Sequence, residues 1–108
     1  MNLPELGPLD LRIGTVVSAY KHPTARIPAY VLTINLGELG TKTSSAQITD
    51  LYDASNLVGR QVICVCNLEP KRIGGVTSEV LTIGAYREDG AVSLIRVDHP
   101  VADGTPLA

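Results

Sequence analysis

Apolar and polar residues alternate with a period of two along much of the chain, the pattern of strands that bury one face. The clearest case is residues 30–36, where four apolar residues alternate with Val31, Thr33 and Asn35. Residues 11–20 are rich in β-branched side chains and predict an earlier strand, in which Gly14 indicates a bulge or a tight bend. Gly37 to Gly40 then supplies a turn.

The middle of the chain predicts a polar strand, a short helix and a fully buried strand. Residues 41–47, TKTSSAQ, predict a strand whose hydroxyls and Lys42 face water or a ligand. Residues 48–58 change to a helical period, with Thr49 or Asp50 as the N-cap and Gly59 just past the end. Residues 62–68 are apolar on both faces, so we expect the barrel core to cover one face and a helix or another subunit the other.

Two further strands are predicted at residues 78–86 and 91–98, joined by a turn in which Asp89-Gly90 is a strong hairpin signal. The sum is five or six short strands with one short helix between the third and fourth. This outline predicts an all-β fold, a five-stranded Greek-key barrel of the OB type. The chain has 108 residues and no linker-like segment, so we expect a single domain spanning residues 1–108.

Composition restricts the possible partners. The formal net charge is −2, so any binding to nucleic acid must use a local basic patch. The only aromatic residues are four tyrosines, which limits stacking on bases. Residues 1–10 resemble no signal peptide, and no apolar run reaches membrane-spanning length. We therefore expect a cytoplasmic protein with no membrane insertion.

The chain shows no enzyme motif and no metal-ligand spacing. Cys64 and Cys66 share one face of a predicted strand with their Cα atoms about 6.6 Å apart, a poor fit for a disulfide. His22 and His99 lie far from them in the sequence, so we interpret the cysteines as small core residues and expect no metal. Neither histidine stands beside a nucleophile, and no phosphate-loop signature is present. We expect neither catalysis nor a cofactor.

The candidate binding site is the loop between two apolar strands in residues 67–86, NLEPKRIGGVTSEVLTIGAY. Lys71 and Arg72 place two positive charges on this loop, where they suit phosphate, although a solvated hairpin would look the same. Asn67 and Ser78 bracket the loop, and each suits either a ligand hydrogen bond or a turn cap.

Four other residues are predicted near this loop. Lys42, Ser44 and Ser45 fall on the polar strand, and Gln47 stands at its end. Glu79 would repel phosphate if exposed, and it is also placed to pair with Lys71 or Arg72 across the hairpin. The predicted RNA-binding or peptide-binding residues are Lys42, Ser44, Ser45, Gln47, Asn67, Lys71, Arg72, Ser78 and Glu79.

Four segments together resemble the CsaA family of small export-related chaperones: Asp10–Val16, His22–Gly37, Ser44–Ile48 and Asn67–Ala85. This family is built on the tRNA-binding OB domain that is also appended to methionyl- and phenylalanyl-tRNA synthetases. The broader family commonly has Ser-x-Gly-Met where this chain has residues 78–81, SEVL. That difference resembles the chaperone branch.

The resemblance implies a five-stranded OB barrel, a homodimer, and recognition of tRNA-like structure or of unfolded preprotein segments. Three hypotheses follow: a tRNA binder that uses a basic rim, a chaperone that holds peptide in an apolar groove, and an accessory domain that docks onto another protein. A homodimer is also indicated by the doubly apolar strand and by tail residues such as Val101 and Leu107, which suggest apolar surface left to cover.

Overall fold

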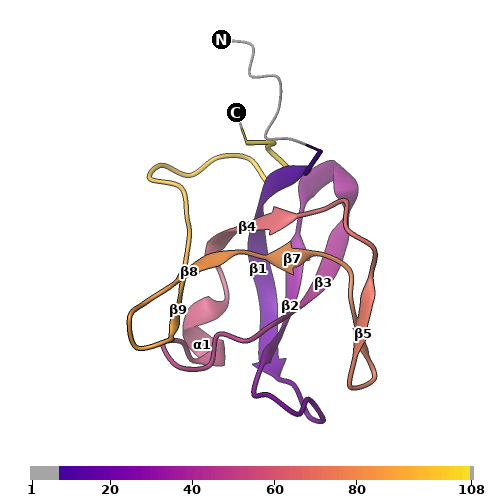
Figure 1. The fold of residues 1–108 in the computed structure, drawn as a ribbon. Coiled ribbons are helices and arrows are strands. Elements are labelled where there is room, and N and C mark those ends of the chain that lie inside the picture. Colours follow the sequence, from indigo (N-terminus) through magenta and orange to yellow (C-terminus); the bar gives the residue numbers. More distant parts are fainter. Residues whose placement is uncertain (1–7, 108) are drawn as a thin grey trace.

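The computed structural model describes residues 8–107, so most of the N-terminal segment considered above lies outside the described residues. Its main sheet has the order β3-β2-β1-β4-β7 and curls into a barrel, with two small hairpins at its sides (Figure 1). This confirms the predicted OB-type fold, with one short α-helix between β3 and β4. The elements are β1 (Leu11–Lys21), β2 (Tyr30–Asn35), the 3-10 turn η1 (Gly37–Leu39), β3 (Thr41–Ala46), α1 (Ala54–Leu57), β4 (Gln61–Val65), β5 (Lys71–Ile73), β6 (Val76–Ser78), β7 (Leu81–Thr82), β8 (Gly84–Tyr86) and β9 (Val92–Leu94).

Strand β1 bends, but the bulge is not at Gly14. The register with β2 shifts between Val16 and Ser18, so Val17 is the bulged residue. Gly14 has another function, because a Cβ atom there would lie 2.6 Å from Ile34 Cγ2 and 2.7 Å from Leu36 Cδ2. Glycine at this position lets β2 approach β1 closely.

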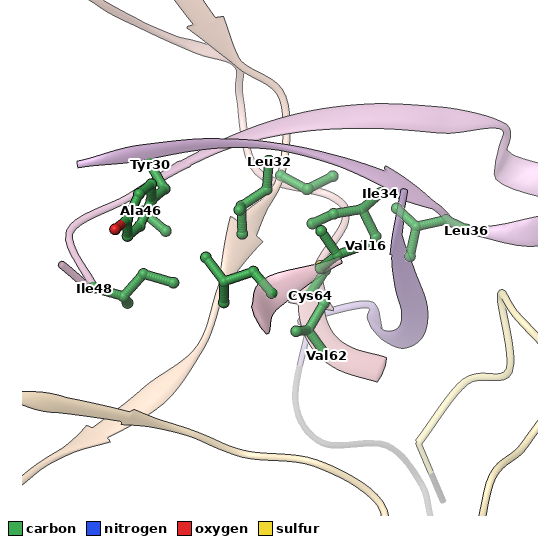
Figure 2. Packing of buried hydrophobic residues seen from close by; sticks show 11 residues of the cluster. Val16, Tyr30, Leu32, Ile34, Leu36, Ala46, Ile48, Val62 and Cys64 are labelled. Carbon is green, nitrogen blue, oxygen red and sulfur yellow. The ribbon is translucent and has the colours of Figure 1, made fainter. Parts of the chain in front are cut away.

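The core follows the predicted alternation of β2. Tyr30, Leu32, Ile34 and Leu36 are all buried and pack with residues from β1, β3, β4 and α1 (Figure 2). An aliphatic cluster of this kind supplies the main favourable term of folding.

The prediction that another subunit or a helix must cover the second face of β4 is wrong. Ile63 is 6% exposed and Val65 is 3% exposed in a single chain. The C-terminal segment 101–107 of the same chain runs beside β1 and β4. Leu107 N donates to Leu11 O at 2.9 Å, and Gln61 Nε2 donates to Val101 O at 2.7 Å.

The helix is shorter than predicted. It begins after Asp53, whose backbone N–H donates to Asn56 Oδ1 at 3.2 Å, and Gly59 follows its end with φ +88°. Residues 49–51 form a turn instead. The helix cannot extend further back because Asp53 has an extended backbone, with φ −102° and ψ 156°, and caps the helix together with Asn56. The segment before it is held elsewhere, since Tyr30 Oη donates to Tyr52 O at 2.8 Å.

The predicted strand at 78–86 is divided among β6, β7 and β8. Its backbone turns to different partners in succession, since Glu79 N donates to Thr43 O at 2.7 Å and Ile83 N donates to Ile63 O at 3.0 Å. The last part, β8, pairs with β9 around Asp89-Gly90, which confirms the predicted hairpin.

His22 attaches the β1–β2 loop to the β5–β6 hairpin. Its Nδ1 accepts bonds from the backbone N–H groups of Thr24, at 3.1 Å, and Ala25, at 3.0 Å. Nε2 therefore carries the proton and donates to Ile73 O at 2.7 Å. Thr24 Oγ1 donates to Gly74 O, so two loops about 50 residues apart in sequence are joined side by side.

We predict that His22→Ala loosens the β5–β6 hairpin. The change removes the bond to Ile73 and leaves two backbone N–H groups without their acceptor, at a cost of about 1 to 3 kcal/mol in the free energy of unfolding. Urea denaturation gives that free energy, and amide hydrogen exchange of Val76 reports on the hairpin.

The matched control is His99→Ala, because the His99 side chain is 90% exposed. It should leave both measurements unchanged. If the two variants behaved alike, His22 would not hold the hairpin.

Candidate nucleic-acid interface

The side chains of Ser78, the last residue of β6, and of the residue after it close the barrel against the edge of β3. Ser78 Oγ accepts a bond from Ser45 N at 3.0 Å and donates to Val80 O at 3.2 Å. One residue further, a Glu79 carboxylate oxygen accepts from Thr43 N at 3.0 Å. The expected pairing of Glu79 with Lys71 or Arg72 is therefore wrong, because its carboxylate is used by the β3 backbone.

A groove with a volume of about 710 Å³ lies where β3, the β5–β6 hairpin and the β7–β8 segment meet. Side chains on the outer face of the β3 edge and around the base of the hairpin line it. Five of the nine predicted site residues are among them: Ser45, Gln47, Lys71, Ser78 and Glu79.

The groove also has an apolar component. Leu68, Leu81 and Tyr86 all line it and are exposed large hydrophobic residues, with Tyr86 84% exposed. Ile27, from the β1–β2 loop, contributes a fourth. This combination suits a ligand that is partly apolar.

The groove carries a net negative charge. Asp50, Glu69 and Glu79 line it and Lys71 is its only cationic lining residue among those described, so its formal charge is 1 − 3 = −2. Arg72 lies on the opposite face of β5, where Nη1 donates to Thr77 Oγ1 at 3.2 Å. Of the two hairpin cations, only Lys71 therefore lines the groove, and Arg72 lies outside it.

Two predicted residues on β3 point elsewhere. Ser44 is fully buried, and its Oγ accepts a bond from Thr82 Oγ1 at 2.9 Å. Lys42 falls on the same face of the strand, two residues earlier, and is half-buried. The expectation that Ser44 faces water or a ligand is therefore wrong, because alternate residues of a strand point to opposite faces and that of Ser44 is the interior one. Lys42 does not line the groove.

Asn67 acts on the backbone of the chain's own N-terminal segment. Its Oδ1 accepts from Asp10 N at 2.8 Å and its Nδ2 donates to Pro8 O at 2.6 Å. These bonds differ from both predicted uses of Asn67, since they cap no turn of its own loop and the residue does not line the groove.

The sequence interpretation missed the β1–β2 loop. His22 and Thr24 join this loop to the hairpin, and Arg26, two residues beyond Thr24, is exposed. Arg26 makes no ion pair within residues 8–107. The signal available in the sequence was His22-Pro23 at the end of a strand, since a histidine at a strand end beside a proline suits a loop anchor.

The cysteines are core residues, as predicted. Cys64 belongs to the core cluster, Cys66 packs against it, and both are free thiols. Burial raises the pKa of Cys64 to about 12 and also raises the pKa of Cys66, so neither is an available thiolate near neutral pH. Over residues 8–107, we find neither a group of potential metal ligands nor a helix long and apolar enough to cross a membrane.

The sequence matches known proteins over nearly all its length. The family described as "Putative tRNA binding domain" matches residues 11–106. The methionine–tRNA ligase of Methanocaldococcus jannaschii is 34% identical over 107 residues, which is 99% of this chain but 16% of the ligase. The chain therefore spans about a sixth of the length of that relative.

Two solved structures titled as CsaA chaperones are similar over almost the whole fold. The protein from Bacillus anthracis str. Ames is 47% identical with a TM-score of 0.88, over 93% of this chain and 91% of that one. The protein from Picrophilus torridus is 38% identical with a TM-score of 0.87, over 94% and 92%. Since the family match extends from β1 to the C-terminal segment that binds β1, this chain belongs to the tRNA-binding domain family, and its fold is that of the CsaA proteins.

Proposed function

We propose that this chain is a non-catalytic domain that binds tRNA, or RNA of similar structure, through the surface around the β5–β6 hairpin. The observation that carries the proposal is that Lys71 and Arg72 are exposed and form no ion pair within residues 8–107. They stand on a hairpin whose position is fixed by His22 and Thr24.

The charges explain how an acidic protein would bind RNA. Arg72 offers a planar fork and Lys71 a mobile ammonium group, and both suit phosphate oxygens. Arg26 is a third exposed cation, on the loop that Thr24 joins to the hairpin. The groove itself is acidic, so we expect phosphates on the hairpin and sugar or base edges near Ser45 and Gln47.

The other predicted site residues enter the proposal differently. We expect Ser78 and Glu79 to be positioning residues, since both bind the backbone of β3 and hold the hairpin base to the barrel. Lys42, Ser44 and Asn67 do not line the groove and are left outside the proposed interface.

The double variant K71A/R72A should bind tRNA with lower affinity, and its affinity should depend less steeply on salt concentration. Two lost phosphate contacts reduce the slope of log affinity against log salt by about 0.7 to 0.9 each. Fluorescence anisotropy with labelled tRNA at several salt concentrations measures affinity and slope together.

The control for net charge is Arg87→Ala, on the exposed turn between β8 and β9, where Arg87 pairs with Asp89 at 3.5 Å. It should leave the slope unchanged. An unchanged slope in K71A/R72A, with folding intact, would mean that the hairpin is not the RNA site.

A second candidate function is the holding of an extended peptide in the groove. The observation that favours it is the groove's composition, apolar at Leu81 and Tyr86 and with a net charge that repels phosphate.

Tyr86→Ser tests this candidate. Loss of an aromatic anchor should weaken binding of an unfolded, mildly basic peptide by more than tenfold and leave tRNA affinity unchanged. Tyr20→Ser, which alters a half-exposed tyrosine on β1, is the matched control. If isothermal titration calorimetry gave equal peptide affinity for both variants, the groove would not be the peptide-binding site.

We also propose that the chain forms a homodimer. The buried second face of β4 no longer supports this, but exposed apolar side chains remain outside the groove, including Val17 and Val58 at 48% and 49% exposure. The two lie near each other, since Gly59 N donates to Val16 O at 2.8 Å. Covering such residues is a common reason for twofold association.

Sedimentation velocity at micromolar concentration should therefore give twice the mass of 11.4 kDa. Monomer mass over the whole range from 1 to about 100 µM would be incompatible with a dimer of useful affinity.

A further inference from the structure

A second pocket, which the RNA and peptide proposals do not use, lies on the other side of the barrel. It has a volume of about 780 Å³ and lies between the α1–β4 connection and the segment that follows β9. Figure 1 shows α1 and β9 on the side of the barrel away from β5, so this pocket is separate from the hairpin. Arg60 and Arg96 both line it, and we call it the two-arginine pocket.

Arg60 is held in a fixed position. Its Cζ atom lies 5.1 Å from the centroid of the Tyr52 ring, a cation-π contact. The ring is itself fixed, because its hydroxyl accepts a bond from Leu94 N at 2.9 Å. The backbone N–H of Arg60 donates to Leu57 O at 3.2 Å, so both the main chain and the side chain of Arg60 are anchored.

The segment carrying Arg96 is held at both ends. Leu94 is bound to the Tyr52 hydroxyl, and Val101 exchanges two bonds with the side-chain amide of Gln61, at 2.7 and 3.2 Å. Gln61 therefore positions the segment through both the nitrogen and the oxygen of its amide. The pocket is organised before any ligand arrives.

Arg60 has a buried donor with no acceptor. Its Nε is inaccessible to solvent and makes no hydrogen bond within residues 8–107. Neither Arg60 nor Arg96 forms an ion pair in this part of the chain. A group that water cannot reach is also closed to a phosphate, so a ligand in the pocket would meet the terminal guanidinium nitrogens of Arg60, which are not among the buried unpartnered atoms.

The electrostatics of the pocket favour an anion. Two arginines and one carboxylate, that of Asp98, give the lining a formal charge of 2 − 1 = +1, in a chain whose net charge is −2. The Asp98 side chain is 97% exposed and faces His99 at 3.3 Å, so it opposes the arginines only weakly. Guanidinium groups offer paired donors that match phosphate geometry.

We propose that the two-arginine pocket binds a phosphate group, with Arg60 and Arg96 as its ligands. The volume exceeds that of one phosphate and admits a nucleotide. Two sources share this chemistry: a free nucleotide, or a phosphate of an RNA chain bound at the hairpin. Only the second source rests on the proposed function.

Titration of ¹⁵N-labelled protein with sodium phosphate, at constant ionic strength set by chloride, tests the site directly. The amides of Gly59, Gln61 and Val97 should shift saturably at millimolar phosphate, and AMP should do the same at lower concentration. Arg96→Gln should weaken binding at least tenfold, as should Arg60→Gln, whereas K71A/R72A should bind phosphate normally.

Arg96→Gln is the decisive variant, because Arg96 is exposed and its change leaves the Tyr52 contact intact. Absence of saturable shifts in the unaltered protein would overturn the proposal, as would equal phosphate affinity in Arg96→Gln and the control Arg87→Gln.

Salt dependence of tRNA binding then separates the sources. A smaller slope in Arg96→Gln assigns the site to RNA, and an unchanged slope with lost AMP binding assigns it to free nucleotide. If the protein binds no tRNA at all, the proposed function fails. The phosphate titration still shows whether the two-arginine pocket binds phosphate.

Discussion

Strand β1 lies between two neighbours, pairing with β4 through residues 11–15 and with β2 through residues 15–21, and the sheet can curl into a barrel only if this shared strand bends. The bulge at Val17 supplies the bend, and Gly14 lets Ile34 and Leu36 pack directly over the backbone. The C-terminal segment binds the edge of β1 around Leu11 and Ile13. The core and the C-terminal segment are therefore both organised from this one strand.

Closure at the other end of the sheet is achieved by side chains. Strand β7 pairs with β4 alone, over two residue pairs, and shares no ladder with β3. Ser78 and Glu79 instead bind the backbone N–H groups of Ser45 and Thr43. The residues that close the barrel thus also line the groove. Their polar side chains have a structural role in addition to any contact with a ligand.

Acidic and basic side chains gather at different places on the protein. Carboxylates gather in the groove, whereas Lys71 and Arg72 stand on the hairpin and Arg60 and Arg96 face a separate pocket. An acidic protein can in this way present local positive sites, because exposed charges act mainly within about one Debye length, roughly 8 to 10 Å in physiological salt. Net charge by itself therefore says little about which anions such a domain binds.

The sequence alone determined the features that depend on near neighbours: the alternation of residues 30–36, the hairpin at Asp89-Gly90, the place of the short helix between the third and fourth strands, and the buried character of Cys64. From these the barrel class followed. The position of Lys71 and Arg72 on an exposed loop was likewise predictable, because it rests on local composition.

Tertiary structure decided the rest. The link from His22 to Ile73, the bond from Glu79 to Thr43 and the binding of the C-terminal segment to the edge of β1 all join groups far apart in sequence. Such contacts form only when the barrel closes, and closure selects partners by geometry that no local pattern encodes. The sequence thus determined the elements, and the closing of the barrel determined which side chains were left for binding.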